Sequence, residues 1–144
     1  MEQLWDVVRD PHHLPRWWPR VTRVEGVDGA AFTEVMRTRK GKLVRADFDL
    51  VRVDESERLL TWAQRVEGTP FERVLSSAET DVRLAPLDGA TEVTIELRQT
   101  LARVSTRRGG VLSALAPRIG GRMVRRAAEG TLEQALEGLE QISG

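Results

Sequence analysis

The chain has 144 residues, 40% of them hydrophobic, and its 22 basic and 22 acidic residues leave no net charge at pH 7. This length and composition predict one globular domain over residues 1–144. The absence of cysteine excludes disulfides, thiol nucleophiles and thiolate metal sites, and a net charge of zero argues against nucleic acid as a partner. No apolar run is long enough to cross a bilayer and no signal-peptide pattern is present, so we expect a cytoplasmic protein without integral membrane association.

The first segment predicts two short helices. Residues 2–9 form an amphipathic helix with Trp5 on its apolar face, and it ends before Pro11 because the residue preceding a proline avoids helical angles. A second helix can begin at Pro11, with Asp10 as its N-cap, and it ends near Trp17.

Six strands are predicted next. Apolar and polar residues alternate from residue 20 to about 103, and five turn signals rich in Gly, Asp and Pro interrupt this pattern. Connections this short join antiparallel neighbours, whereas parallel neighbours need long crossovers. We therefore predict an antiparallel meander with strands at 20–26, 31–39, 43–53, 58–66, 72–85 and 91–103.

A long helix is predicted from about residue 109 to 142, because apolar residues recur there every three to five positions. Pro117 and the pair Gly120–Gly121 interrupt its first half, so a kink is expected. Seven arginines and no acids lie between residues 103 and 128. We interpret them as a solvated face rather than a nucleic-acid or membrane-surface patch, since no aromatic residues interleave with them.

Several short strings carry a family resemblance through their order and spacing: Leu4–Val8, Asp10–Pro11, Leu14–Pro19, Leu59–Trp62 and Gly89–Thr94. Together with the order of two helices, six strands and one long helix, they resemble the SRPBCC or START-like helix-grip superfamily, in its polyketide cyclase/dehydrase branch. The resemblance implies an α+β helix-grip fold, in which a curved antiparallel sheet of six strands wraps around the long C-terminal helix.

The chain departs from this superfamily at its start. Members usually begin with a strand that pairs with the last strand, whereas this sequence begins inside the first predicted helix. Either the start codon is placed too late, or the strand is missing and residues 91–103 form an open edge. An open edge favours pairing with a second chain, so a homodimer through this strand is a further hypothesis.

Alternation predicts which strand residues face the cavity between sheet and helix. Polar residues share the inward positions with apolar ones, and burying each without a partner would cost about 1 to 3 kcal/mol. This favours a hydrated or ligand-filled space, although a twist or bulge could instead place them at the cavity mouth or outside. The predicted ligand-binding residues are Glu34, Met36, Phe48, Leu50, Trp62, Gln64, Ser76, Ala78, Thr80, Gln99, Leu115, Ile119 and Met123.

Glu34 is the only acid on an otherwise apolar inward row, which makes it a weak candidate for a catalytic general base, or else a hydrogen-bonding anchor. No histidine or second acid accompanies it on that face, although acid/base chemistry normally needs such a partner. His12 and His13 are the only histidines and are expected at the surface, so no metal site and no cofactor is predicted.

The leading functional hypothesis is binding of a small hydrophobic or amphipathic molecule, of lipid, polyketide or isoprenoid type, in the cavity between sheet and C-terminal helix. One alternative, implied by the resemblance, is a polyketide aromatase/cyclase-type enzyme. A further alternative is a protein interaction module that uses the open edge and the arginine-rich helix. Whether the protein is an enzyme stays open.

Overall fold

The sheet of this protein is an antiparallel meander. A computed structural model describes residues 1–102 and 130–142. Each strand pairs with its neighbour in the chain, in the order β1-β2-β3-β4-β5-β6. This confirms the predicted topology. The strands are β1 (Val21–Asp28), β2 (Ala31–Arg37), β3 (Leu43–Asp54), β4 (Leu59–Gln64), β5 (Leu75–Leu87) and β6 (Ala90–Leu101).

The N-terminal helices are close to their predicted positions. The helix α1 (Glu2–Arg9) is followed by the 3₁₀ helix η1 (Pro11–His13) and the single turn α2 (Leu14–Trp17). The Asp10 side chain accepts a hydrogen bond from the backbone N–H of His12, as expected for an N-cap. The second predicted helix is therefore split into a 3₁₀ turn and an α turn.

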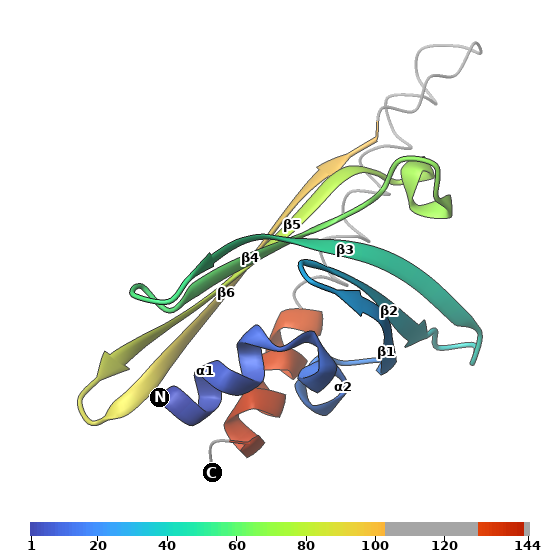
Figure 1. The fold of residues 1–144 in the computed structure, drawn as a ribbon. Helices are drawn as coiled ribbons and strands as arrows, with labels where there is room; N and C mark the ends of the chain where they lie inside the picture. The colour runs from blue at the N-terminus through green and yellow to red at the C-terminus, as the bar shows by residue number, and fades with distance from the viewer. Residues whose placement is uncertain (103–129, 143–144) are drawn as a thin grey trace, which may run out of the picture.

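The C-terminal helix includes residues 130–142. Its predicted beginning near residue 109, the interruptions at Pro117 and Gly120–Gly121, and the arginine-rich stretch lie outside the described residues. Figure 1 shows the curved sheet with α1, α2 and the C-terminal helix on one of its faces. The architecture is that of a helix-grip fold.

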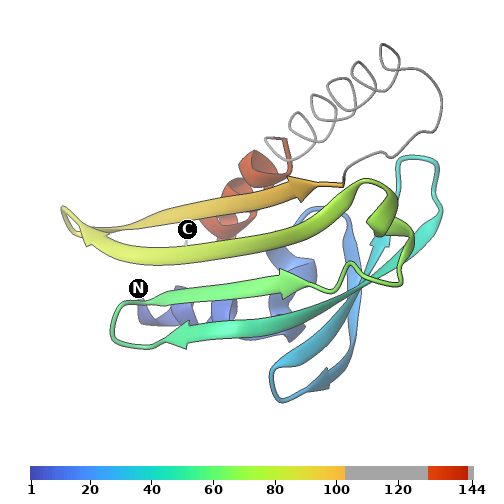
Figure 2. The same ribbon diagram turned by 90° about the horizontal axis from the view of Figure 1, so that it is seen from above.

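The main core lies between the sheet and these helices. It is built from residues of α1, α2, the strands and the C-terminal helix, and Trp5, Leu60, Val82 and Leu139 are almost completely buried. Figure 2 shows the succession of strands from above, with β6 outermost on one side. Helices cover the inner face of the sheet. At its edge, β6 has no strand on its outer side among the described residues.

One glycine sets the approach of the C-terminal helix to α2. A Cβ atom added at Gly138 would lie 2.5 Å from the carbonyl oxygen of Trp17 and 2.8 Å from its Cα. Both neighbours are backbone atoms, which cannot move aside as a flexible side chain would. The helix can therefore reach this depth only with glycine at this position.

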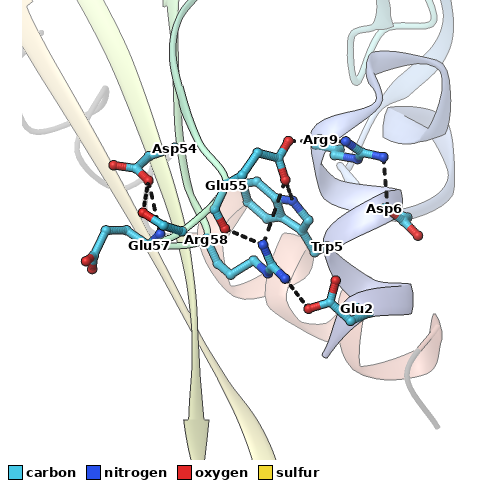
Figure 3. A network of polar contacts seen from close by, with 9 residues as sticks. Glu2, Trp5, Asp6, Arg9, Asp54, Glu55, Glu57 and Arg58 are labelled. Atoms are coloured by element: carbon cyan, nitrogen blue, oxygen red, sulfur yellow. Dashed lines mark hydrogen bonds and ion pairs between the residues drawn. The ribbon is translucent and has the colours of Figure 1, made fainter.

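A polar cluster, which we call the α1 junction, joins α1 to the turn between β3 and β4 (Figure 3). The indole N–H of Trp5 donates to Oε2 of Glu55 at 2.6 Å, and Arg9 donates to the other carboxylate oxygen at 3.1 Å. Arg58 pairs with Glu2 and donates to the backbone carbonyl of Glu55, with its guanidinium carbon 5.8 Å from the centroid of the Trp5 ring. These contacts fix α1 against the sheet.

Candidate functional site

A pocket of about 290 Å³ lies between the inner face of the sheet and the C-terminal helix. Five strands contribute side chains to it, because every second residue of a strand points to the same face. The segment around the 3₁₀ helix η2 (Pro70–Arg73) and the C-terminal helix close its sides. The described residues that line it are Trp18, Glu34, Met36, Phe48, Trp62, Gln64, Phe71, Val74, Leu75, Ala78, Thr80, Leu97, Gln99 and Thr131.

The strand register brings these side chains together. Phe48 on β3 is opposite Gln64 on β4, and Trp62 on β4 is opposite Thr80 on β5. Directly opposed residues on one face have Cβ atoms about 5 Å apart. The floor of the pocket is therefore a continuous patch of apolar and polar side chains across the centre of the sheet.

Glu34 is the most unusual residue of this patch. Its side chain is 2% exposed, and Oε1 has no hydrogen-bond partner among the described residues. Burial raises the pKa of this carboxyl group to about 8, because the charged form loses its hydration. At pH 7 Glu34 is therefore mainly an uncharged carboxylic acid, which can both donate and accept a hydrogen bond.

The side chain of Gln64 also has a buried polar atom without a hydrogen-bond partner within the part of the chain that the structure describes. Its Nε2 atom is buried and finds no acceptor among the described residues. Two other buried side-chain atoms in the described part of the chain lack a partner, Trp17 Nε1 and Arg58 Nε, and neither residue lines the pocket. Buried polar groups in native proteins are normally hydrogen-bonded. Two buried groups without a hydrogen-bond partner, which we call orphaned groups, therefore indicate that a partner is missing from this pocket.

Aromatic rings form one wall. Trp18 and Trp62 line the pocket, and their ring centroids are 5.5 Å apart in an edge-to-face arrangement. Trp17 contacts both rings, at 5.4 and 6.2 Å, and is itself buried in the core.

Most of the described candidates for ligand binding lie around the pocket. These are Glu34, Met36, Phe48, Trp62, Gln64, Ala78, Thr80 and Gln99. Leu115, Ile119 and Met123 lie outside the described residues. Contact of any of them with a ligand stays a prediction.

Two candidates do not line the pocket. Ser76 is exposed and its hydroxyl donates to the backbone carbonyl of Thr100 at 3.2 Å. A register shift between Leu75 and Ser77 interrupts the alternation at this point, so the inward position passes to Leu75. Leu50 is half-buried and packs against the main core instead.

Sequence reasoning also missed several lining residues. Phe71 belongs to η2 and lies just before the predicted strand 72–85, and Pro70 was the available signal for a helical turn. Leu97 and Val74 were not among the predicted ligand contacts. Thr131 comes from the helix, where no polar lining residue was proposed.

A second hollow, of about 740 Å³, lies where α1, the beginning of β6 and the C-terminal helix meet. Its described lining includes Leu4, Val7, Val93 and Ile142. None of the orphaned polar atoms of the described residues belongs to a residue that lines it. The smaller pocket is therefore the better candidate for a specific site.

The described residues contain no group of three or more histidine and acidic side chains that could hold a metal ion. His12 and His13 are at the surface next to Asp10, at 2.9 and 3.8 Å from its carboxylate oxygens. Over the same part of the chain, none of the helices has the length and apolar character needed to cross a membrane.

The fold and the pocket define a helix-grip protein. Residues 1–143 match the family described as polyketide cyclase/dehydrase and lipid transport, and the chain belongs to this family. No curated protein matches the sequence.

Solved structures support the fold. A conserved protein from Geobacillus kaustophilus has a TM-score of 0.69 at 17% identity, with 97% of this chain and 85% of that chain covered. Ara h 8.0201 has a TM-score of 0.64 at 16% identity, covering 96% of this chain and 89% of that chain.

The di-domain ARO/CYC BexL from the BE-7585A biosynthetic pathway has a TM-score of 0.68 at 16% identity, with 97% of this chain covered. The match spans only 41% of the length of BexL. At these identities the similarity shows the fold alone.

Proposed function

We propose that the protein binds a small hydrophobic or amphipathic molecule, of lipid, polyketide or isoprenoid type, in the pocket between the sheet and the C-terminal helix. The observation that carries the proposal is the pair of orphaned groups, Glu34 Oε1 and Gln64 Nε2, in one largely apolar pocket. Each group costs about 1 to 3 kcal/mol while it is buried without a partner. A ligand that supplies the partners would remove this cost.

The pocket also limits the size of the ligand. Ligand pockets range from about 300 to 1,000 Å³, and about 290 Å³ over the described residues is at the lower end. Binding would gain about 25 cal/mol for each Å² of apolar surface buried against Trp62, Phe48 and Met36. A compact ring system or a short chain suits this pocket better than a phospholipid with two acyl chains.

The proposal is tested first by native mass spectrometry of the purified protein, which should detect a co-purifying small molecule. Melting temperatures are then measured with 2-naphthol, farnesol and lauric acid. Gln99→Phe fills the pocket from β6 and should abolish the shifts. The matched variant Thr100→Phe places the same ring at the next, exposed position and should preserve them. Absence of any co-purifying molecule and of any shift would contradict the proposal.

A cyclase-type enzyme is the second candidate function. The observation that favours it is the position of Glu34 in the pocket with a pKa of about 8, because general acid/base catalysis works best when the pKa lies near the working pH. Against it, no hydrogen bond links Glu34 to Gln64, and no histidine lines the described part of the pocket.

The hypothesis of a cyclase-type enzyme is tested with 2,6-heptanedione as substrate. Intramolecular aldol closure and dehydration of this diketone form a cyclohexenone and release one water. Product formation is followed by chromatography for the wild type and Glu34→Gln. Catalysis by Glu34 predicts a loss of at least about 100-fold in the variant, as for removal of a general acid or base. Equal rates for both proteins, at the level of buffer alone, would exclude this reaction.

We also propose that a second copy of this chain pairs with the edge strand β6, which among the described residues contacts only β5 within the sheet. An antiparallel register with Ile95 opposite Ile95 would place Glu92 of one copy opposite Arg98 of the other, twice. It would also set Val93 opposite Leu97 on the inner face. Cross-strand pairs of these kinds each stabilise a sheet by about 0.2 to 1 kcal/mol.

The dimer is tested by light scattering coupled to size exclusion over a range of concentrations. Glu92→Lys should weaken the dimer at least tenfold, because it would face Arg98 in this register. Glu96→Lys makes the same change of charge opposite Thr94 and should have a smaller effect. A monomeric mass for the wild type at all concentrations would exclude the interface.

A further inference from the structure

We propose that Glu34 and Gln64 together select ligands whose polar end is uncharged and both donates and accepts hydrogen bonds, such as a primary amide or a hydroxyl group. This inference rests on the proposed binding function and assigns the chemistry that the pocket recognises. It follows from where the two side chains lie, from the atoms that they leave unpaired and from the charges around them.

The sheet places Glu34 and Gln64 diagonally across β3. Glu34 on β2 is opposite Ala46, and Gln64 on β4 is opposite Phe48, two residues further along β3 on the same face. Two strand spacings and this offset put the two Cα atoms about 10 to 12 Å apart. Two extended side chains and one small ligand group would span this distance, and Ala46 places only a methyl group next to Glu34.

The unpaired atoms are complementary to one kind of ligand group. Gln64 Nε2 is a donor and requires an acceptor, whereas Glu34 Oε1 accepts or, when it carries the proton, donates. A carbonyl oxygen would satisfy Gln64 and an adjacent N–H or O–H would satisfy Glu34. A purely apolar ligand would leave both groups unsatisfied.

The charges of the pocket disfavour ionised ligands. No lysine, arginine or histidine is among its described lining residues, so a carboxylate or phosphate would be buried without a cation. An ammonium group would have to ionise Glu34, whose pKa of about 8 favours the neutral form at pH 7. An uncharged polar group avoids both costs.

The test uses probes that share one apolar body and differ in the polar group: naphthalene, 2-naphthol, 2-naphthamide, 2-naphthoate and 2-naphthylmethylamine. Dissociation constants are measured by calorimetry at pH 6.5. We expect 2-naphthamide to bind at least about tenfold more tightly than naphthalene, which corresponds to about 1.4 kcal/mol from two hydrogen bonds. The anionic and cationic probes should bind more weakly than naphthalene.

Variants then assign this preference to the two residues. Glu34→Leu and Gln64→Leu should each abolish the preference for 2-naphthamide and keep the affinity for naphthalene. Thr100→Leu, at an exposed position of β6 that does not line the pocket, should preserve it. Circular dichroism verifies folding, and Glu34→Gln replaces Glu34→Leu if the latter does not fold. In the wild type the preference should rise between pH 7 and 9, because the ionised Glu34 accepts more strongly from the amide N–H, and in Glu34→Gln it should not change with pH.

The outcomes separate this inference from the proposed function. If no probe binds, the binding function itself is wrong. If naphthalene binds as tightly as 2-naphthamide, the pocket binds ligands but Glu34 and Gln64 do not select them. If 2-naphthylmethylamine binds best, the pocket selects cations through an ionised Glu34, and the inference is overturned.

Discussion

The α1 junction and the floor of the pocket each contain a glutamate next to a tryptophan-rich core, yet the two acids are in opposite states. At the junction, the pKa of Glu55 is lowered, first by the hydrogen bond from the Trp5 indole and then by Arg9. In the pocket, burial without a partner raises the pKa of Glu34. Glu55 is exposed and Glu34 is buried, so exposure and hydrogen-bond partners, more than residue type, decide whether each carboxyl group is charged.

This difference separates structural polar groups from groups available to a ligand. At the junction the carboxylate, the indole and the guanidinium groups bond to one another, although Arg58 leaves its Nε unpaired. In the pocket, the two orphaned atoms belong to Glu34 and Gln64, which line the same cavity. Removing a hydrogen-bonded side chain at the junction should therefore destabilise the protein, whereas replacing Gln64, whose polar atom is unpaired, should do little harm or even stabilise it.

The largest effect is expected from Trp5→Ala, which empties the centre of the junction. Trp5 is 1% exposed, and losing a buried tryptophan costs about 3 to 5 kcal/mol. Urea denaturation measures the change in the free energy of unfolding. Trp5→Phe keeps a ring but leaves Glu55 without its indole donor and should lie between wild type and Trp5→Ala. A loss below about 1 kcal/mol for Trp5→Ala would mean that the junction does not hold α1.

The pH dependence of stability tests Glu34. Its pKa is 4.5 ordinarily and about 8 in the folded protein, so between these values the folded state binds the extra proton. Stability therefore falls as pH rises from about 4.5 to 8, by at most about 1.4 kcal/mol per pH unit and about 5 kcal/mol in total, and is constant above. Glu34→Gln should remove this contribution. Urea titrations at pH 5, 6.5 and 8 that give the same slope for both proteins would contradict a buried, unpaired Glu34.

Gly138→Ala tests the packing that holds the helical wall of the pocket. The added methyl group meets the backbone of Trp17 at 2.5 Å, which should cost about 1 to 3 kcal/mol despite a gain of about 0.5 to 1 kcal/mol in helix propensity. Gly130→Ala is the matched control in the same helix, since its Cβ would meet no described atom within 4 Å. It should be neutral or slightly stabilising. A stabilising Gly138→Ala would show that the helix can move away from α2.

The smallest effect is expected from Gln64→Leu. Its Nε2 atom has no partner among the described residues, so replacing it with an apolar group should change the free energy of unfolding by less than about 1 kcal/mol, in the stabilising direction. Urea denaturation of the ligand-free protein is the measurement. A decrease of 2 kcal/mol or more in the free energy of unfolding would mean that Gln64 is hydrogen-bonded in the folded protein. Its role would then be structural, like that of the residues in the α1 junction.

The fold could be predicted because its signals are local. Turn residues at regular intervals predicted the meander, and Asp10–Pro11 predicted the break between α1 and the next helical turns. Strict alternation was sufficient in β2 and β4, where Glu34 and Gln64 were assigned inward and line the pocket.

The features that the sequence did not predict depend on local irregularities and on contacts between distant residues. The register shift near Ser76 and the 3₁₀ turn at Phe71 have no periodic signal. The hydrogen bond between Trp5 and Glu55 joins residues fifty positions apart, and no pattern within one segment predicts it. Alternation marks an inward side chain, but only the three-dimensional structure shows that it lacks a partner.

The two tryptophans at the pocket wall and Trp17 behind them have a consequence for optical measurements. Trp17, Trp18 and Trp62 lie within 6.2 Å of one another, close enough for excitation absorbed by one indole to pass to the others. A molecule in the pocket would touch two of these rings and thereby alter the emission of all three. The fluorescence of the unlabelled protein should therefore report occupancy of the pocket, with Trp5 at the junction as a constant background.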